Sequence, residues 1–263
     1  LKGKKLLKSE SRALRLCRHT NVARFIAFSE DAVMLLTEIG VRGDVKKFIS
    51  TENPTPSERF HIALGTANGM KALHAVNLLH LDLKLQNVVL SGDLTPKITD
   101  FGLNVSPEGH LSDMMSGTGS ALPTAVLTDR YKAPELFEKY CRKEKSADVY
   151  SFSMFLFEIF TSKPPWADLS QSQIIMLHLK ANSENKVDRP GIPDQVPLPI
   201  RQSRLMERCW EQEPRHRPTF DDVVSSLTGM RNEFDPASNA ASRIAVSSKR
   251  IKDLTFFTRC PMG

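Results

Sequence analysis

Cysteine is scarce in this 263-residue sequence, and long hydrophobic runs are absent. The most apolar stretch, residues 151–160, contains Ser153 and Glu158 and is too short to span a bilayer. No signal peptide is visible at the start. The cysteines lack the paired spacing of a zinc site or a disulfide framework, which is typical of reduced thiols. We therefore expect a soluble cytoplasmic protein without a membrane partner. The four cysteines are Cys17, Cys141, Cys209 and Cys260.

Charge of one sign is only mildly in excess. The sequence has 36 Lys and Arg against 30 Asp and Glu, a net charge of +6, which weakly favours acidic partners such as phosphates or nucleic acid. The basic residues fall into short clusters of mixed sign, and aromatic residues do not alternate with them as a base-stacking surface requires. We expect no nucleic-acid partner. Nucleic-acid binding remains a hypothesis that rests on net charge alone.

The first half of the chain alternates helical and extended patterns. Residues 4–18 show the spacing of an amphipathic helix, and the apolar runs 22–30 and 32–39 predict a β-hairpin. Thr55, Pro56 and Glu58 have the pattern of a helix N-terminus, with a capping hydroxyl, an N1 proline and an N3 carboxylate. The apolar stripe after them carries that helix to about residue 76.

The second half is mainly helical. Residues 87–90 and 96–99 predict a second hairpin, and residues 103–132 are a long loop rich in Ser, Thr, Gly and Pro. A helix that is apolar all round starts at Ser146 and is expected at the centre of a helical body. Further helices are predicted near 171–182, 199–211 and 219–229, the last starting at Thr219 and Asp222 and ending at Gly229. The residues beyond 234 are treated as a flexible extension.

Polar side chains with matching chemistry lie in the loops of this pattern. Residues 80–87, HLDLKLQN, carry Asp82, Lys84 and Asn87, and Asp100 follows the last strand of the second hairpin. Two carboxylates and an amide oxygen suit Mg²⁺, which prefers few carboxylates plus phosphate oxygens. A carboxylate free of metal can accept the proton of a hydroxyl. The lysine can neutralise a transferring phosphoryl group.

At these residues the sequence resembles the protein kinase family. His80 to Asn87 match the catalytic loop H-R-D-L-x-x-x-N, with Leu81 in place of the arginine. The triplets DFG at 100–102 and APE at 133–135 follow in the family's order and spacing. Residues 37–49 and the CW…RP segment at 209–218 look like the tyrosine-kinase-like group. The lysine two residues after Asp82 is similar to serine/threonine kinases.

The resemblance implies a role for each matched position. Asp82 is expected to be the catalytic base and Lys84 to stabilise the γ-phosphate, while Asn87 and Asp100 hold Mg²⁺. ATP is the implied nucleotide, and a protein is the implied substrate. Thr37 corresponds to the gatekeeper of the nucleotide pocket. The remaining nucleotide contacts are the backbone of Glu38 and Gly40 and the side chain of Val89, which forms the pocket floor.

Other matched positions are implied to have structural or regulatory roles. His80 is expected to be a core histidine that bonds to the backbone, and Asp148 is the structural acid of the buried helix. Glu135 is expected to pair with Arg217. The other implied positions are Glu10 of the helix before the first hairpin, Phe101 and Gly102 of the DFG triplet, and Thr128, which helps to hold the catalytic Asp and Lys.

The sequence departs from the family pattern at two places. Leu81 replaces the arginine that usually receives a phosphorylated activation-loop residue, so switching through that contact is not expected. Before Glu10 there is neither a glycine-rich phosphate loop nor a suitably placed lysine, and the sequence opens on Leu1 rather than Met. We therefore expect only two strands in the small-lobe sheet, with an exposed edge.

We predict an α+β, protein-kinase-like fold with a mainly helical large lobe and an incomplete antiparallel small-lobe sheet. Residues 1–40 form a partial small lobe, 41–232 the large lobe and 233–263 a flexible tail. The predicted function is transfer of the γ-phosphoryl group of Mg·ATP to serine or threonine hydroxyls of proteins. The alternative is a pseudokinase or scaffold that uses the fold for protein binding.

Overall fold

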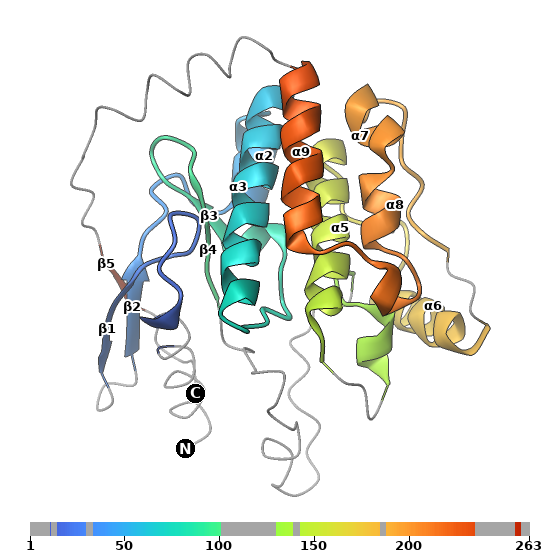
Figure 1. Cartoon of the computed structure of the whole chain (residues 1–263), viewed down its shortest axis with the longest axis horizontal. Coiled ribbons are helices and arrows are strands. Elements are labelled where there is room, and N and C mark those ends of the chain that lie inside the picture. Colours follow the sequence, from blue (N-terminus) through green and yellow to red (C-terminus); the bar gives the residue numbers. More distant parts are fainter. Residues whose placement is uncertain are drawn as a thin grey trace, which may run out of the picture.

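A computed structural model describes residues 11, 15–29, 34–100, 130–138, 143–184, 188–234 and 256–258. A small antiparallel sheet lies at one side of a helical body (Figure 1). Of the helix predicted over 4–18, Ser11, Arg15 and Leu16 are helical in the described residues, and the helix ends before Cys17. The predicted loop over 103–132 lies outside the described residues except for its last three.

The first predicted hairpin is present. β1 (Phe25–Ser29) pairs antiparallel with β2 (Met34–Glu38), with an irregularity in register between Phe25 and Ala27. A third strand, β5 (Phe256–Thr258), pairs antiparallel with the other edge of β2. This strand lies within the segment expected to be a flexible extension. The three residues of β5 have high β-propensity, and they pair with backbone groups on an edge of β2 that was expected to be exposed.

Two helices follow the sheet. Asp44 caps α2 (Val45–Thr51), because its carboxylate accepts a hydrogen bond from the Lys47 backbone N–H at 2.8 Å. α3 (Pro56–Ala75) starts with the predicted capping box: the Glu58 N–H donates to Thr55 Oγ1 at 3.3 Å, and the Thr55 N–H donates to Glu58 Oε2 at 2.7 Å. The start of α3 and its end near residue 76 are as predicted.

The second predicted hairpin packs on α3. β3 (Val88–Leu90) and β4 (Pro96–Ile98) are antiparallel, and the 3₁₀ helix η1 (Leu85–Asn87) precedes them. Gly69 of α3 lets the segment at Asn21 lie close to the helix, since a Cβ at Gly69 would lie 2.5 Å from the Asn21 carbonyl oxygen. Asn21 in turn accepts a hydrogen bond from the Ile98 N–H at 2.9 Å. The segment before β1 is therefore anchored to both α3 and β4.

The apolar helix is α5 (Lys145–Thr161), and its residues from Ala147 onward are all buried, as predicted. It packs against α3 and α8 (Leu205–Cys209) in the helical body (Figure 1). Within α5, Phe152 and Phe155 stack with their ring centroids 5.7 Å apart. None of the helices in the described part of the chain is long and apolar enough to cross a membrane.

The last helices differ from the prediction in two places. The helix predicted over 199–211 is broken at Arg204, whose φ is 52°, into α7 (Leu198–Ser203) and α8 (Leu205–Cys209). α9 (Phe220–Phe234) starts with the predicted Thr219 and Asp222 cap but continues past Gly229. Gly229 lies inside the helix, and its φ is not positive, so it does not form the left-handed C-terminal cap that was predicted. The remaining elements are α6 (Gln171–Glu184), η2 (Pro134–Phe137) and η3 (Pro214–His216).

Candidate active site

The loop between α3 and β3 brings three predicted residues into direct contact. Asp82 Oδ2 accepts hydrogen bonds from Lys84 Nζ at 2.8 Å and from Asn87 Nδ2 at 2.9 Å. Asn87 Nδ2 also donates to the Asp82 carbonyl oxygen at 2.7 Å. Both of these side-chain contacts of the Asp82 carboxylate fall on one oxygen, so Oδ1 points elsewhere. The carboxamide of Asn87 is likewise oriented with its nitrogen toward Asp82 and its oxygen Oδ1 free to meet a cation.

His80 joins this loop to the end of β4. Its buried ring accepts the Asp82 N–H at Nδ1 over 3.3 Å, so the ring proton lies on Nε2, which donates to the Thr99 carbonyl oxygen at 3.0 Å. The Thr99 N–H donates back to the Asn87 carbonyl oxygen at 2.9 Å. Asp100, the next residue, adopts a left-handed conformation with φ 66°. Asp100 therefore follows directly on the residue that bonds to Asn87, at the end of the second hairpin where the catalytic loop enters β3.

Asp148 of α5 supports the loop that carries Asp82. Its fully buried carboxylate accepts the His80 N–H at 2.9 Å, the Leu81 N–H at 2.7 Å and His74 Nε2 at 2.8 Å. Burial alone would raise the pKa of Asp148. The hydrogen bond from His74, the hydrogen bond from the His80 N–H and the favourable electrostatics of the two rings outweigh burial and lower that pKa. The carboxylate is therefore held ionised as the acceptor for three donors.

Leu81 stands in a strained backbone conformation at the centre of this arrangement. Its φ is 62°, a left-handed region in which a leucine costs about 1–2 kcal/mol. Asp148 Oδ1 holds its N–H, and its side chain packs partly against the core. The strain is thus maintained by the buried acid, and it turns the chain so that Asp82 faces away from the core with its side chain 18% exposed.

The oxygen atoms of this site fit a magnesium ion better than a transition metal. In the described part of the chain, no three His, Cys, Asp or Glu side chains gather into a metal-binding group. One carboxylate and one amide oxygen leave coordination positions to phosphate oxygens and water, which is how Mg²⁺ is usually bound with a nucleotide. The donor pair of Asn87 and Asp100 therefore fits Mg²⁺ together with a phosphate, and Asp82 stays free of the metal.

Two of the predicted nucleotide contacts lie against each other. A Cβ on Gly40 would lie 2.5 Å from Val89 Cβ, so the backbone at Gly40 is in close contact with the Val89 side chain. Thr37 and Glu38 end β2. The Glu38 N–H donates to the Arg24 carbonyl oxygen at 2.9 Å, and its carboxylate pairs with Lys97 at 3.1 Å. The N–H of Glu38 is therefore already used within the sheet.

The expected ion pair of Glu135 and Arg217 is present. Arg217 Nη1 and Nη2 donate to the two carboxylate oxygens at 2.6 Å and 2.9 Å, and Nε donates to the Glu211 carbonyl oxygen at 2.8 Å. The side chain of Arg217 is fully buried. The bidentate pair links η2 to the segment before α9.

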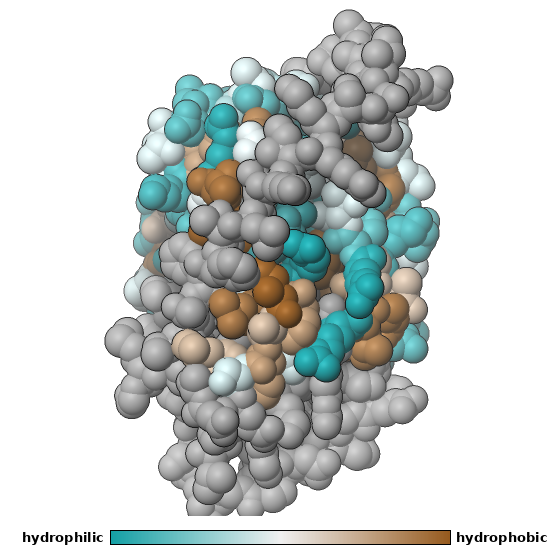
Figure 2. Space-filling view, turned by 90° about the vertical axis from the view of Figure 1, so that its left-hand side faces the viewer, coloured by the Kyte–Doolittle hydropathy of each residue, from teal (hydrophilic) through white to brown (hydrophobic). Residues whose placement is uncertain are grey.

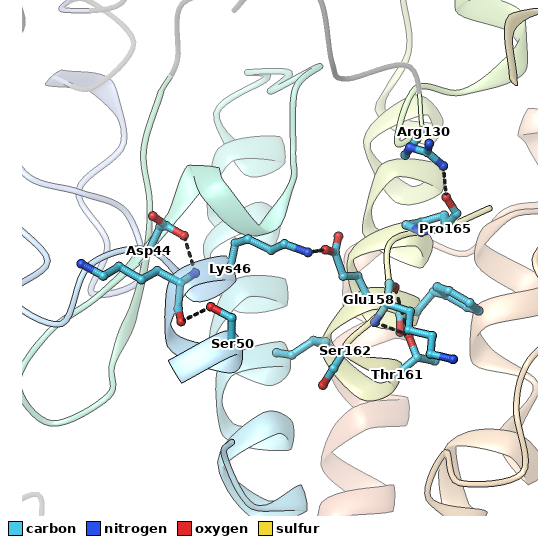
Figure 3. A network of polar contacts seen from close by, with 12 residues as sticks. Asp44, Lys46, Ser50, Arg130, Glu158, Thr161, Ser162 and Pro165 are labelled. Atoms are coloured by element: carbon cyan, nitrogen blue, oxygen red, sulfur yellow. Dashed lines mark hydrogen bonds and ion pairs between the residues drawn. The ribbon is translucent and has the colours of Figure 1, made fainter. Parts of the chain in front are cut away.

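An unpredicted ion pair lies beneath the site. Figure 3 shows the Lys46 ammonium group reaching from α2 to the Glu158 carboxylate on α5. The Glu158 side chain is 1% exposed, and no described residue donates to its second oxygen, Oε2. Burial raises the pKa of Glu158, and the hydrogen bond and charge of Lys46 oppose this shift only in part.

We expect Lys46→Met to destabilise the protein by about 2 kcal/mol at neutral pH, because it leaves a buried carboxylate unpaired. The expected loss of stability is smaller than for a fully buried ion pair, because the Lys46 side chain is 35% exposed. A raised carboxyl pKa means that stability falls as pH rises from the unfolded-state value through the folded-state value. The loss should therefore nearly vanish at about pH 4 and grow toward pH 7 in urea unfolding.

The matched control is Lys71→Met, whose partner Asp221 is 70% exposed. It should cost less than about 1 kcal/mol. A loss in Lys46→Met that does not change with pH would mean that the aliphatic stem of Lys46, not its charge, stabilises the fold.

Four of the predicted positions lie outside the described residues. They are Glu10, Phe101, Gly102 and Thr128. Sequence reasoning also missed residues that the structure brings to the site. His74 donates to Asp148, a contact that the sequence did not indicate, and Lys46 and Glu158 were not singled out as a pair. A glutamate inside an otherwise apolar helix was the available signal for a buried ion pair.

Comparison with known proteins gives the family of this chain. The family model for protein tyrosine and serine/threonine kinases matches residues 2–227. RGS domain-containing serine/threonine-protein kinase A of Dictyostelium discoideum is 31% identical over 245 residues, which are 92% of this chain and 20% of that protein. Dual specificity protein kinases shkE and splA of the same organism are 32% and 31% identical over 85% and 87% of this chain. The chain spans 30% and 10% of their lengths.

Proposed function

Because this chain belongs to the protein tyrosine and serine/threonine kinase family, we propose that it transfers the γ-phosphoryl group of Mg·ATP to serine or threonine hydroxyls of a protein. The observation that carries the proposal is the loop in which Asp82, Lys84 and Asn87 contact one another beside Asp100. A base, a charge neutraliser and metal ligands lie within reach of a single phosphate there.

Asp82 acts as the base in this proposal. Lys84 and Asn87 fix its Oδ2, which leaves Oδ1 to accept the proton of the attacking hydroxyl. The Lys84 side chain is 19% exposed, so its ammonium group can meet the negative charge of the transferring phosphoryl group. Mg²⁺, when bound, neutralises charge on the phosphates, and Asn87 Oδ1 and Asp100 are the side chains that would hold it.

The nucleotide base lies beside β2 and β3 in this proposal. The contact of Gly40 with Val89 brings two of the implied nucleotide contacts together, which supports a shared apolar surface for the base. Thr37 at the end of β2 lines this surface. Since the Glu38 N–H is used within the sheet, its carbonyl oxygen is the group that meets the base.

The remaining assignments concern structure and specificity. We assign support of the catalytic loop to His80 and Asp148, and support of the segment before it to Glu135 and Arg217. Glu10, Phe101, Gly102 and Thr128 keep the roles implied by the family pattern. Lys84 favours serine and threonine as acceptors. A cytoplasmic location is supported by the scattered cysteines. The scaffold alternative is not favoured, because the relatives bear the names of protein kinases.

The first test is Mg²⁺-dependent binding of ATP by this chain, measured as a thermal shift. ATP at 100 times its Kd should stabilise the protein by about 2.7 kcal/mol when Mg²⁺ is present. Asp100→Asn should lose this Mg²⁺-dependent part. Asp93→Asn, which changes an exposed acid at the opposite end of the same hairpin, should keep it. Equal shifts with Mg²⁺ and with EDTA in the unaltered chain would argue against the metal-nucleotide site.

A further inference from the structure

A basic cavity lies away from the catalytic loop, where the segment after the first helix enters β1. It has a volume of about 350 Å³. Arg15, Arg18 and Arg24 line it together with His19, and none of the described lining residues carries a carboxylate. Figure 2 shows the side of the molecule that carries the small sheet, where hydrophilic and hydrophobic side chains meet. The cavity lining combines basic and apolar side chains, because Cys17, Val22 and Phe25 complete it.

The three arginines keep their charge available. Lys46, Lys84 and Lys97 of the described part of the chain, by contrast, each contact a carboxylate. Over the same ranges, no carboxylate lies in ion-pair contact with any of the three guanidinium groups that line the cavity. Arginine cannot lose its proton at neutral pH, so the cavity holds a permanent positive potential.

The backbone that carries these side chains is fixed. The His19 carbonyl oxygen accepts the Val22 N–H at 3.0 Å, and His19 Nδ1 accepts the Asn21 N–H at 3.1 Å. The Ala23 N–H donates to the Ile98 carbonyl oxygen at 2.8 Å, which ties the turn to β4. Burial and the charge of Lys97 lower the pKa of His19. The neutral ring accepts at Nδ1 and therefore presents an N–H donor at Nε2.

Arg15 is positioned by an aromatic ring. Its guanidinium carbon lies 4.7 Å from the centroid of Phe25, a cation–π contact that orients the planar group at the cavity wall. Cys17 and Val22, 5% and 2% exposed, form an apolar floor beneath it. A guanidinium group offers paired N–H donors that match phosphate oxygens, while the floor suits a short aliphatic stem.

We propose that this cavity binds the phosphate monoester of a phosphorylated serine or threonine side chain on a peptide. The three arginines and the His19 N–H contact the phosphate oxygens, and Val22 and Phe25 contact the carbon stem. A bare anion would leave the apolar floor unused. The proposal does not involve the catalytic loop, so it stands or fails independently of phosphoryl transfer by this chain.

The probes for the test are N-acetyl-phosphothreonine methylamide, its unphosphorylated form and orthophosphate, titrated by calorimetry in low salt. The phosphorylated probe should bind more tightly than either of the others. Arg18→Gln and Arg24→Gln should each weaken its binding about tenfold or more, since each removes charge-assisted hydrogen bonds. Both arginines are exposed, so folding should survive, and circular dichroism checks this. The matched control Arg215→Gln changes an exposed arginine within η3 and should bind like the unaltered chain.

Several results would overturn the proposal. Equal affinity for orthophosphate and the phosphorylated probe would indicate an adventitious ion only. Displacement of the probe by saturating Mg·ADP would place it in the nucleotide site. Unchanged binding in the Arg18→Gln, Arg24→Gln double variant, or no binding by the unaltered chain, would remove the cavity as a phosphopeptide site.

Discussion

Replacing Asp82 with Asn is expected to lower kcat for phosphoryl transfer about 10²–10⁴-fold without changing the thermal shift by Mg·ATP. The substitution keeps the size of the side chain and removes its ability to accept a proton. Lys84 and Asn87 contact Oδ2, so the reacting oxygen in our proposal is Oδ1. Single-turnover phosphorylation of a generic protein substrate such as casein, with radiolabelled ATP, measures the rate.

The expected separation of rate from binding distinguishes a base from a metal ligand. Asp100→Asn should weaken Mg²⁺-dependent binding of ATP, whereas Asp82→Asn should leave it in place. Asp194→Asn is the matched control, because that carboxylate is 99% exposed and pairs only with Arg201 among its described contacts. A kcat above one tenth of the unaltered value in Asp82→Asn would contradict the assignment of the base. Loss of the thermal shift would instead mean that Asp82 supports nucleotide binding.

The parts of the fold that could be predicted from sequence depend on short-range chemistry. The capping box at Thr55 and Glu58 lies within four residues, and its hydrogen bonds form as expected. The two hairpins follow from apolar runs on either side of short turns. The buried helix α5 follows from its uniform apolarity. In each case the residues that decide the structure are neighbours in the chain.

The candidate site was predictable for a similar reason. Asp82, Lys84 and Asn87 fall within one loop, and the hairpin that follows brings Asp100 back to Asn87. The family resemblance added the pairing of Glu135 with Arg217, which spacing alone does not indicate. These two residues are 82 positions apart.

The features that sequence reasoning missed depend on tertiary contacts. Nothing in the local sequence around Arg204 indicates the left-handed backbone that separates α7 from α8. β5 exists because β2 offers an unpaired edge, not because its own three residues favour a strand strongly enough alone. His74 lies on the apolar stripe of α3, where the sequence indicates only a core residue. Its hydrogen bond to Asp148 becomes evident only when α5 packs against α3.

Replacing Asp148 with Asn should have the largest effect on stability. Three donors converge on its buried carboxylate: the His80 N–H, the Leu81 N–H and His74 Nε2. An asparagine has one acceptor oxygen and one NH₂ group. Whichever way it is oriented, its NH₂ faces at least one of these donors. Loss of charge-assisted bonds and a buried unsatisfied donor together should cost about 3–5 kcal/mol.

The expected pH dependence follows from the lowered pKa of Asp148. A carboxyl whose pKa is lower in the folded state stabilises the fold above the unfolded-state pKa, and this contribution is lost as pH falls through the folded-state value. The difference in unfolding free energy between the unaltered chain and Asp148→Asn should therefore be full at neutral pH and shrink below about pH 4. Urea unfolding at several pH values measures it.

The consequence should extend to catalysis, because Asp148 holds the strained backbone at Leu81. Without that hydrogen bond, the left-handed conformation relaxes and Asp82 loses its position. Phosphoryl transfer should then be lost even at temperatures where Asp148→Asn is folded by circular dichroism. Asp221→Asn makes the same chemical change in an exposed pair with Lys71 and should cost less than about 1 kcal/mol. If the two variants unfolded at the same urea concentration, the buried acid could not be what holds the catalytic loop.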